Sequence, residues 1–313
     1  METPEPVVWS FDRLLAENLP AAVVWSTPSV RGRSESTLSY RHRTPLAGLD
    51  EDTRTLIVIG GGTLLDAAKI FRHEHAAKVT LIAIPSIWGS GAESSPIALA
   101  TGPDGRKVIR MGPEYLPDVR VFWLELADSV PLRLARHACG DAWSHALEGF
   151  LSPLASEDLL SRGASVLSSM LDLPIGPDPR WFEASADACR LQSQSSVGLV
   201  HGIAHTLEGP LRAAQPEFGW GHAALCSTFL WPVLSLALGA SERAGHRLRD
   251  AGIDPGRISE IARALFDPEA YDRALPFLVT HWRSVLRDPC TRTNGVVVRP
   301  STLDYFQRRE LRD

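Results

Sequence analysis

Lysine and cysteine are both scarce in this 313-residue chain. Lysine occurs only at Lys69, Lys78 and Lys107, and every other basic side chain is an arginine. The four cysteines lie far apart and form no Cys-x-x-Cys pair, which argues against a zinc–thiolate site and against a disulfide framework. With a net charge of −5, the sequence also gives no sign of the concentrated basic face that nucleic-acid binding requires.

Long apolar runs are missing as well. The run at residues 229–239 is too short to span a bilayer, and it contains Pro232. The first six residues, Met-Glu-Thr-Pro-Glu-Pro, do not begin a secretory signal, because no basic region is followed by an apolar segment. We therefore expect a cytoplasmic protein that binds neither membrane nor nucleic acid.

The distribution of strand-like and helix-like segments divides the chain into two parts. Up to residue 128, short β-rich runs alternate with glycine, proline and helical pieces, which is typical of an α/β fold with a parallel sheet. Beyond that point apolar residues recur at helical spacing. We predict an α/β domain over residues 1–128 and an all-helical domain over residues 129–313. The expected strands are residues 21–25, 55–59, 79–84 and 119–124, and the expected helices are residues 132–150, 156–173, 182–211, 223–238 and 255–265.

Gly60, Gly61 and Gly62 lie between a predicted strand and a predicted helix. Glycines at such a place allow a tight turn and a close approach of a ligand, and the first amides of the helix favour phosphate. A plain strand-to-helix turn would have the same composition, and the Gly-x-Gly-x-x-Gly fingerprint of dinucleotide binding is absent. The three glycines alone leave both interpretations open.

A second glycine-containing loop, residues 85–94, follows the strand predicted at residues 79–84 and combines small hydroxyl side chains with Gly89 and Gly91. At the carboxyl end of a strand, such a loop can wrap a pyrophosphate or a ribose through its amides and hydroxyls. A loop of similar composition could also connect two elements without binding a ligand.

Asp141 and His145 are four residues apart in a predicted helix, so both side chains project from one face and can share a cation. His201 and His205 have the same spacing in another predicted helix, and His222 follows. Taken singly, each histidine would suit a satisfied core role. Together with Asp141 they form an oxygen-and-nitrogen donor set that suits Fe²⁺ or Zn²⁺ better than Ca²⁺ or Mg²⁺.

In this order, the segments resemble the iron-containing alcohol dehydrogenase family, part of the superfamily that includes dehydroquinate synthase and glycerol dehydrogenase. The family patterns are Gly-Gly-Gly-Ser-x-x-Asp-x-Ala-Lys, Pro-Thr-Thr-x-Gly-Thr-Gly-Ser-Glu, Asp-Ala-x-x-His-Ala-x-Glu, His-x-x-x-His and a final His. They correspond here to residues 60–69, 85–93, 141–148, 201–205 and 222, so the resemblance extends from about residue 55 to about residue 235.

The resemblance implies site residues in both domains. The metal, Fe²⁺ or Zn²⁺, would be bound by Asp141, His145, His201 and His222, and His205 would lie near the nicotinamide as a member of a proton relay. The first domain would be a shortened dinucleotide-binding domain. The residues that would contact its NAD(P)H are Gly60, Gly61, Gly62, Asp66, Ser86, Ile87, Ser90 and Lys107.

Two features depart from the family pattern. Family members are usually longer, and residues 26–39 are polar, contain Arg31 and Arg33, and do not indicate the expected first crossover helix. His222 is followed by Ala223, where the family has glycine.

The expected function is the NAD(P)-linked interconversion of an alcohol and an aldehyde or ketone by a metal-dependent homodimer. One alternative is a lyase or cyclase of the dehydroquinate synthase type, although that group typically has a glutamate in place of the Asp141 ligand. The others are a non-catalytic member of the family and a protein whose paired histidines are core residues only.

Overall fold

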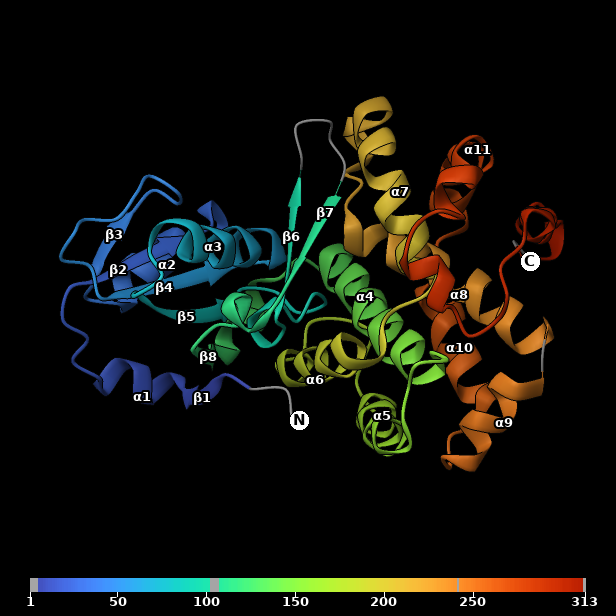
Figure 1. The fold of residues 1–313 in the computed structure, drawn as a ribbon, viewed down its shortest axis with the longest axis horizontal. Helices are drawn as coiled ribbons and strands as arrows, with labels where there is room; N and C mark the ends of the chain where they lie inside the picture. The colour runs from blue at the N-terminus through green and yellow to red at the C-terminus, as the bar shows by residue number, and fades with distance from the viewer. Residues whose placement is uncertain (1–4, 102–106, 241, 312–313) are drawn as a thin grey trace. The chain divides into compact units, whose positions relative to one another are not determined.

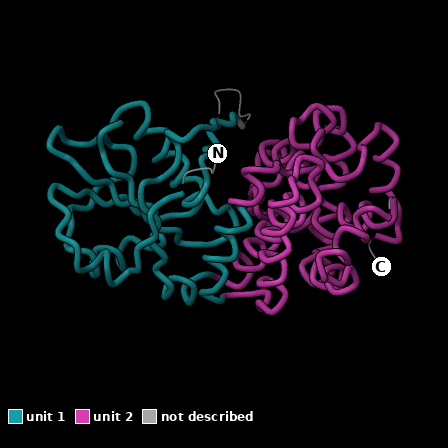
Figure 2. The backbone as a smooth tube through the Cα atoms, turned by 60° about the horizontal axis from the view of Figure 1, so that its bottom comes forward, with its two compact units in different colours: residues 1–130, 178–189 teal, residues 131–177, 190–313 magenta. Residues whose placement is uncertain are grey.

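The protein, described here from a computed structural model over residues 5–101, 107–240 and 242–311, divides into two units. Figure 2 shows unit 1, Met1–Val130 with Asp178–Cys189, in teal, and unit 2, Pro131–Pro177 with Arg190–Asp313, in magenta. The boundary between Cys189 and Arg190 falls inside a helix. The first half of that helix, which the sequence assigned to the helical domain, belongs to unit 1.

Unit 1 is built on a six-stranded sheet in which every pairing is parallel, in the order β1-β8-β5-β4-β2-β3 (Figure 1). Gly60 at the end of β4 is in register with Pro85 at the end of β5, so the loops after these two strands begin at the same edge of the sheet. A separate antiparallel hairpin, β6-β7, completes the strands of the described part. The strands are β1 (Val7–Ser10), β2 (Ala22–Ser26), β3 (Arg41–Arg43), β4 (Thr55–Gly60), β5 (Thr80–Pro85), β6 (Ile97–Thr101), β7 (Lys107–Met111) and β8 (Val119–Phe122).

The central strands of unit 1 are apolar at consecutive positions because both faces of the sheet are covered. Alternate residues such as Val23, Leu56 and Leu81 share one core cluster with Leu65 and Ala68 of α3. The residues between them are buried too, and all six residues of β4 are buried. This is the burial expected of a parallel sheet in an α/β protein. The helices of this unit are α1 (Phe11–Ala16), α2 (Pro28–Thr37), α3 (Gly62–His75) and the beginning of α6 (Arg180–Ser195), with 3₁₀ turns η1 (Ala92–Ser94), η2 (Pro113–Tyr115) and η3 (Leu124–Ser129).

The helix α2 corrects the expectation that residues 26–39 do not form a crossover helix. Pro28 occupies the first turn, where its missing N–H costs nothing and its fixed φ suits the helix. Only Val30 and Ser34, one turn apart, are buried. With a single apolar residue facing the sheet, the helix has no hydrophobic periodicity that the sequence could reveal, and packing on β2 and β4 stabilises it instead.

Unit 2 is helical throughout its described residues, and together with the parallel sheet of unit 1 this confirms the predicted fold class. α8 packs against α4, α7 and α10 (Figure 1). The helices are α4 (Leu132–Leu151), α5 (Glu157–Met170), the end of α6, α7 (Leu199–Ala214), α8 (His222–Ala240), α9 (Glu242–Asp250), α10 (Pro255–Leu265), α11 (Pro268–Val285) and α12 (Leu303–Phe306), with 3₁₀ turns η4 (Pro216–Phe218), η5 (Cys290–Thr293), η6 (Pro300–Thr302) and η7 (Arg309–Leu311).

The single helix predicted over residues 182–211 is wrong, because the chain forms two helices there. α6 ends at Ser195, and Ser196 has a φ of +83°, a left-handed conformation that interrupts the helix. α7 begins at Leu199 after Gly198. Apolar periodicity continues across this break, so periodicity alone could not show it. Because of this break, His201 lies in the first turn of α7 and not in the middle of a long helix.

α8 is, among the described residues, the one helix long and apolar enough to cross a membrane by length and composition. The expectation that no stretch reaches this length was therefore wrong for His222–Ala240. Of its most apolar stretch, 67% is buried inside the protein, as expected of a helix at the centre of a core.

Candidate metal centre and nucleotide-binding loops

Helix α4 supplies the carboxylate of a buried polar cluster. Asp141 and His145 lie one turn apart, as their spacing predicted, among buried small residues such as Ala138 and Ala142. The Nδ1 atom of His145 is 3.9 Å from the Oδ1 atom of Asp141. An isolated buried carboxylate would be costly in such surroundings, so Asp141 needs partners of opposite or coordinating character.

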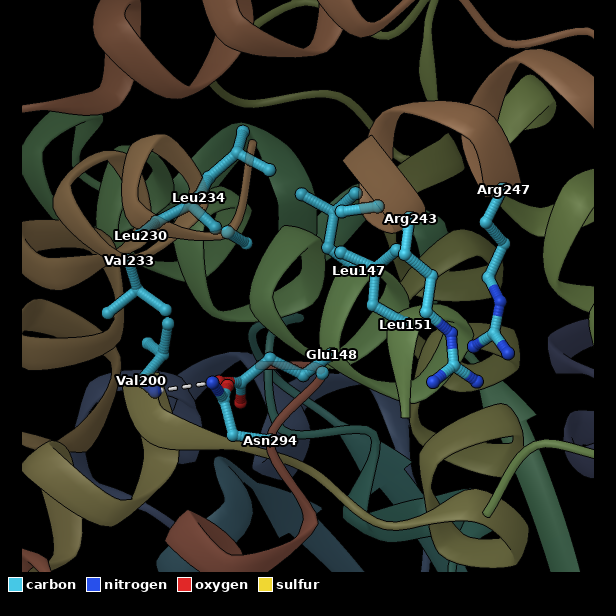
Figure 3. Close-up of a pocket in the computed structure, with 13 residues that line it drawn as sticks. Leu147, Glu148, Leu151, Val200, Leu230, Val233, Leu234, Arg243, Arg247 and Asn294 are labelled. Carbon is cyan, nitrogen blue, oxygen red and sulfur yellow. Dashed lines mark hydrogen bonds between the residues drawn. The ribbon is translucent and has the colours of Figure 1, made fainter. Parts of the chain in front are cut away.

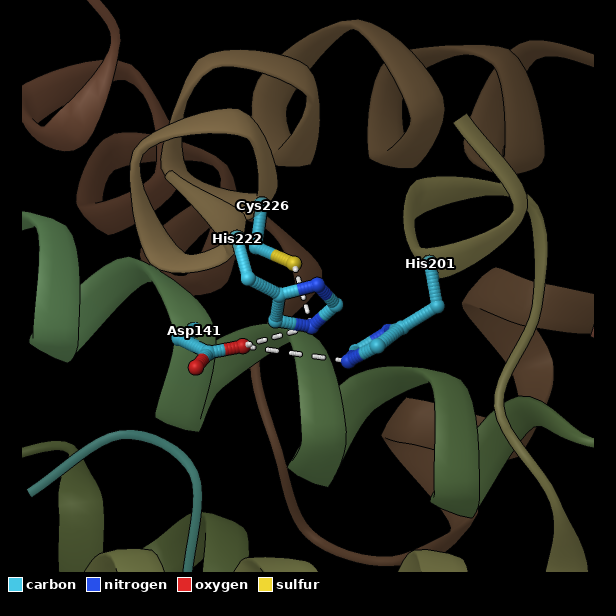
Figure 4. A group of neighbouring side chains, drawn as sticks. All are labelled: Asp141, His201, His222 and Cys226. Carbon is cyan, nitrogen blue, oxygen red and sulfur yellow. Dashed lines mark hydrogen bonds and ion pairs between the residues drawn. The ribbon is translucent and has the colours of Figure 1, made fainter. Parts of the chain in front are cut away.

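Two further helices bring imidazoles to the same oxygen (Figure 4). The Nε2 atom of His201, on α7, lies 3.7 Å from Asp141 Oδ1, and the Nε2 atom of His222, at the start of α8, lies 3.8 Å from it. His145 and His201 also have their ring centroids 4.5 Å apart. Of the four predicted metal ligands, Asp141, His201 and His222 have donor atoms within 4.8 Å of one another, whereas His145 contacts Asp141 and His201 but is not part of that group.

The geometry of this cluster fits a divalent ion. Two ligand atoms that are each about 2.1 Å from one ion stand roughly 3.4 Å apart in a tetrahedral arrangement. The three distances to Asp141 Oδ1, 3.7–3.9 Å, are within about half an ångström of that value. Asp141 Oδ1 and His201 Nε2 are buried and have no hydrogen-bond partner among the residues that the structure describes. Buried polar atoms are normally satisfied, so these two atoms are candidate ligand atoms for an ion.

Glu148, also on α4, contacts the ring nitrogen of His201 that does not face Asp141. Its Oε2 atom lies 2.7 Å from His201 Nδ1, and its Oε1 atom accepts a 2.6 Å hydrogen bond from the backbone N–H of Val200. A carboxylate on one imidazole nitrogen fixes the ring and leaves the other nitrogen as a ligand. Glu148 lies within the segment of Asp141, but its role could not be predicted from the sequence. Its signal was its place one helical turn after His145.

Burial controls the charges in the cluster. It lowers the pKa of His201 well below the usual range, helped by the neighbouring imidazoles, and it lowers the pKa of His222 to about 4. Burial also raises the pKa of Glu148 to about 7, against the lowering effect of the three backbone N–H groups around it. Both histidines are thus neutral near pH 7, and a neutral imidazole has the lone pair that metal coordination requires.

Cys226 is a member of the cluster that the sequence analysis missed. Its Sγ atom lies 3.6 Å from His222 Nε2, and its donor atom groups with those of Asp141, His201 and His222 within 4.8 Å (Figure 4). Burial and the carboxylates of Asp141 and Glu148 raise the pKa of the thiol well above its usual range. The signal in the sequence was the spacing of four residues from His222 on one helix.

His205 lies one turn beyond His201 on α7 and belongs to a second group of side chains. Its ring stacks on that of His222, with centroids 5.3 Å apart and planes 24° apart. Its Nδ1 atom lies 3.5 Å from the Oδ2 atom of Asp288 and 3.9 Å from the Sγ atom of Cys290. Asp288 and Cys290 stand more than 80 positions further along the chain, and no spacing in the sequence linked them to His205.

A cavity of about 40 Å³ lies inside unit 2 (Figure 3). Leucine, valine and alanine side chains form its apolar walls, and Arg243 and Arg247 of α9 line it as well. Glu148 and Asn294 also line it. Because Glu148 contacts His201 too, one carboxylate borders both the cavity and the histidine that faces Asp141.

In unit 1 the two glycine-containing loops meet at one edge of the sheet, as the register of β4 and β5 requires. The backbone N–H of Ser86 donates to the carbonyl of Gly60 at 3.0 Å. A Cβ atom added at Gly62 would lie 2.6 Å from Ser90 Oγ, and one at Gly61 would lie 3.3 Å from the side chain of Ile87. Gly62 is the first residue of α3, so the N-terminus of this helix lies directly beside the loop of residues 85–94.

Asp66 and Lys107 were also predicted to contact the cofactor. Both carboxylate oxygens of Asp66 are used inside the unit: Oδ1 accepts from Lys69 Nζ at 3.1 Å, and Oδ2 accepts from the N–H of Leu99 at 3.1 Å. The backbone of Lys107 begins β7 opposite Thr101. Its side chain is outside the described part of the structure.

The comparisons with known proteins agree with these observations. The family model for iron-containing alcohol dehydrogenase matches residues 45–122. The chain is 29% identical over 227 residues to the 1-propanol dehydrogenase PduQ of Salmonella typhimurium, a match that covers 67% of this chain and 59% of that protein. It is 29% identical over 224 residues to the 4-hydroxybutyrate dehydrogenase of Cupriavidus necator, covering 62% of this chain and 56% of the relative. The chain thus spans little more than half the length of these relatives.

Solved structures show the same fold over nearly the whole chain. The maleylacetate reductase of Agrobacterium tumefaciens superposes with a TM-score of 0.78 at 19% identity, covering 98% of this chain and 96% of that one. The sulfoacetaldehyde reductase of Bifidobacterium kashiwanohense, solved in complex with NAD⁺, superposes with a TM-score of 0.74 at 17% identity, covering 99% and 98%. The family model over residues 45–122 and the curated relatives thus both show that this chain is similar to iron-containing alcohol dehydrogenases.

Proposed function

We propose that this protein is a metal-dependent, NAD(P)-linked oxidoreductase that interconverts an alcohol and an aldehyde or ketone. The observation that carries the proposal is the buried cluster in which one oxygen of Asp141 has three imidazole nitrogens within 4 Å. Core histidines that serve packing alone are expected to find hydrogen-bond partners, whereas His201 Nε2 and Asp141 Oδ1 have none within the described ranges.

In this proposal the metal ligands are Asp141, His145, His201 and His222. The donor set of one carboxylate and three neutral imidazoles suits Fe²⁺ or Zn²⁺. When bound, such a metal supplies Lewis acidity to the substrate oxygen, and a bound nicotinamide supplies or accepts the hydride. Glu148 keeps the ring of His201 oriented through the bond to Nδ1. His205 serves in the proton relay.

The cofactor-binding role is assigned to the two loops of unit 1. The N-cap of α3, Gly61, makes no side-chain hydrogen bond, the first amides of a helix favour a phosphate, and Gly61 and Gly62 allow the chain to come close to it. Ser86, Ile87 and Ser90 lie on the adjoining loop. Asp66 acts here by supporting this region, because its contacts with Lys69 and Leu99 tie α3 to β6. Lys107 remains a predicted contact.

The metal part of the proposal is tested by elemental analysis of the purified protein and two variants. We expect about one Fe or Zn per chain in the wild type, a large loss in His201→Ala, and no loss in His246→Ala, whose side chain is exposed on α9. If His201→Ala lowers stability but leaves the metal content unchanged, His201 is a core residue and the proposed centre is wrong.

The redox part is tested by assays with NAD⁺, NADP⁺ and their reduced forms. The substrates are 1-propanol and 4-hydroxybutyrate, the compounds named for the relatives, and the corresponding aldehydes. We expect net turnover of the nicotinamide that is lost with chelator and restored by Fe²⁺ or Zn²⁺. Full reductase activity in metal-free protein would refute the metal role. Absence of both stoichiometric metal and nucleotide binding would favour a non-catalytic family member.

Location and assembly complete the proposal. We place the protein in the cytoplasm as a homodimer that acts on a small-molecule alcohol or carbonyl compound and binds no nucleic acid or membrane. Mass measurement in solution and fractionation of the native cells test these two points directly.

A further inference from the structure

The Nδ1 atom of the His205 imidazole faces two different side chains. Its Nδ1 atom lies 3.5 Å from the carboxylate of Asp288 and 3.9 Å from the thiol of Cys290. The backbone N–H of Cys290 in turn donates to the other oxygen of Asp288 at 2.8 Å, which fixes the direction of the carboxylate. His205 and Asp288 are both mostly buried, with 10% and 14% of their side chains exposed.

The segment that carries Asp288 and Cys290 is tied to α7 at several points. Gly202 lies so close to the segment that a Cβ atom there would come within 2.1 Å of Thr291 Oγ1. The Oγ1 atom of Thr293 donates to the carbonyl of Val197 at 2.7 Å. The side chain of Asn294 accepts from the first N–H of the helix, that of Leu199, at 3.1 Å. Because these contacts join residues 197–202, just before His205, to residues 291–294, just after Asp288, several contacts fix the position of Asp288 relative to His205.

The two partners favour opposite tautomers of His205. A carboxylate only accepts hydrogen bonds, so it favours the proton on Nδ1, whereas the Cys290 thiol can donate to an unprotonated Nδ1. The Asp288 contact, at 3.5 Å, is an ion-pair distance and not a short hydrogen bond, but the carboxylate carries a full charge, whereas the thiol at 3.9 Å is only a weak donor. Burial raises the pKa of Cys290 beyond its usual range, so the thiol stays neutral and adds no competing charge.

We propose that Asp288 is a positioning residue that holds His205 in the tautomer with its proton on Nδ1. Nε2 then carries the lone pair and is the nitrogen that exchanges a proton in the relay: it takes up the proton that the substrate hydroxyl loses in oxidation and returns it in reduction. This inference deepens the proposed function and rests on it for the role of His205. The tautomer itself is a property of the resting protein.

The test reads the ring nitrogens of His205 directly. Full-length protein labelled with ¹⁵N-histidine and loaded with Zn²⁺, which is diamagnetic, gives long-range ¹H–¹⁵N correlations, and the His205→Gln variant identifies the His205 signals by their loss. We expect a protonated Nδ1 and an unprotonated Nε2 in the wild type. Asp288→Ala should move the proton to Nε2, whereas Cys290→Ala should leave it on Nδ1. Should Asp288→Ala fail to fold, Asp288→Asn, which keeps the size but removes the charge, is expected to give a mixture of the two tautomers.

Kinetics separate positioning from a purely structural effect. Asp288→Ala should lower kcat about 10- to 100-fold with little change in KM, because the substrate still binds while the proton transfer loses its oriented partner. A wild type with the proton on Nε2, or an Asp288→Ala protein that keeps it on Nδ1, overturns the inference. So does a second bound metal per chain that Asp288→Ala removes, since His205, Asp288 and Cys290 would then be ligands. The tautomer result stands without turnover, so a chain that lacks dehydrogenase activity refutes only the proposed function.

Discussion

Replacing Glu148 by glutamine tests how the proposed metal centre depends on a residue that does not bind the metal. The carboxylate accepts three hydrogen bonds at the start of α7, from the N–H groups of Val200 and His201 and from His201 Nδ1. A glutamine amide of nearly the same shape has only one accepting atom. If its NH₂ group faces His201 Nδ1, the ring proton moves to Nε2, which is the nitrogen that lies 3.7 Å from Asp141. If it faces Val200 instead, a buried N–H loses its acceptor.

The expected loss follows from these contacts. Removing the carboxylate behind a ligating histidine typically costs 10- to 100-fold in metal affinity, or about 1.4–2.7 kcal/mol. The effect on folding should be smaller than for Glu148→Ala, which would leave two buried N–H groups unsatisfied and enlarge the cavity that Glu148 lines. Glutamine also removes the cost of a buried charge, since burial raises the pKa of Glu148 to about 7. Glu148→Gln should therefore lose metal affinity while its free energy of unfolding without metal changes little.

The assay is competition for Zn²⁺ between apo-protein and a chelator of known affinity, with urea unfolding in the presence of excess chelator as the stability measurement. Glu93→Gln is the matched control, because Glu93 is equally buried, has a similarly raised pKa and lies in unit 1. We expect the control to bind Zn²⁺ like the wild type. If Glu148→Gln also binds Zn²⁺ within twofold of the wild type while His201→Ala does not bind it, the orienting role of Glu148 is refuted.

The parts of the site that follow from local spacing could be predicted from the sequence. Asp141 and His145 face the same way because four residues make about one helical turn, and the same holds for His201 and His205. That the two loops of unit 1 meet was not predicted, but it follows from equally simple geometry, since the carboxyl ends of parallel strands lie at one edge of a sheet. Each of these features depends only on the geometry of a single element or of two neighbouring strands.

The remaining parts depend on contacts between elements distant in sequence. That Glu148 would contact His201, 53 positions away, depends on how α4 and α7 pack, and periodicity does not contain that information. Asp288 reaches His205 only because the segment after α11 lies on the glycine face of α7 at Gly202. The helix α2 was missed for the related reason that its stability comes from packing on the sheet and not from its own pattern.

The remaining predictions concern stability. Glu93 has its pKa raised from 4.5 to about 7 by burial, so between these pH values the folded state keeps a proton that the unfolded state has lost. The free energy of unfolding should therefore fall by up to about 3 kcal/mol as pH rises through this window, and Glu93→Gln should flatten that slope relative to the wild type in urea titrations. Gly32→Ala, at an exposed helical position with nothing within 4 Å, should stabilise the protein by about 0.5–1 kcal/mol, because alanine loses less backbone freedom on folding. Gly202→Ala is its counterpart in unit 2. The new Cβ would come 2.1 Å from Thr291 Oγ1, and even with the threonine rotated away, the contacts with Thr291 Cβ and N at 3.3 and 3.4 Å would remain tight. The segment must shift from α7, at a cost of about 1–3 kcal/mol in the free energy of unfolding. That shift would also loosen the contact between Asp288 and His205, so the ¹⁵N signals of His205 should change in Gly202→Ala and not in Gly32→Ala. An unperturbed His205 in a destabilised Gly202→Ala protein would show that the close approach at Gly202 does not position Asp288.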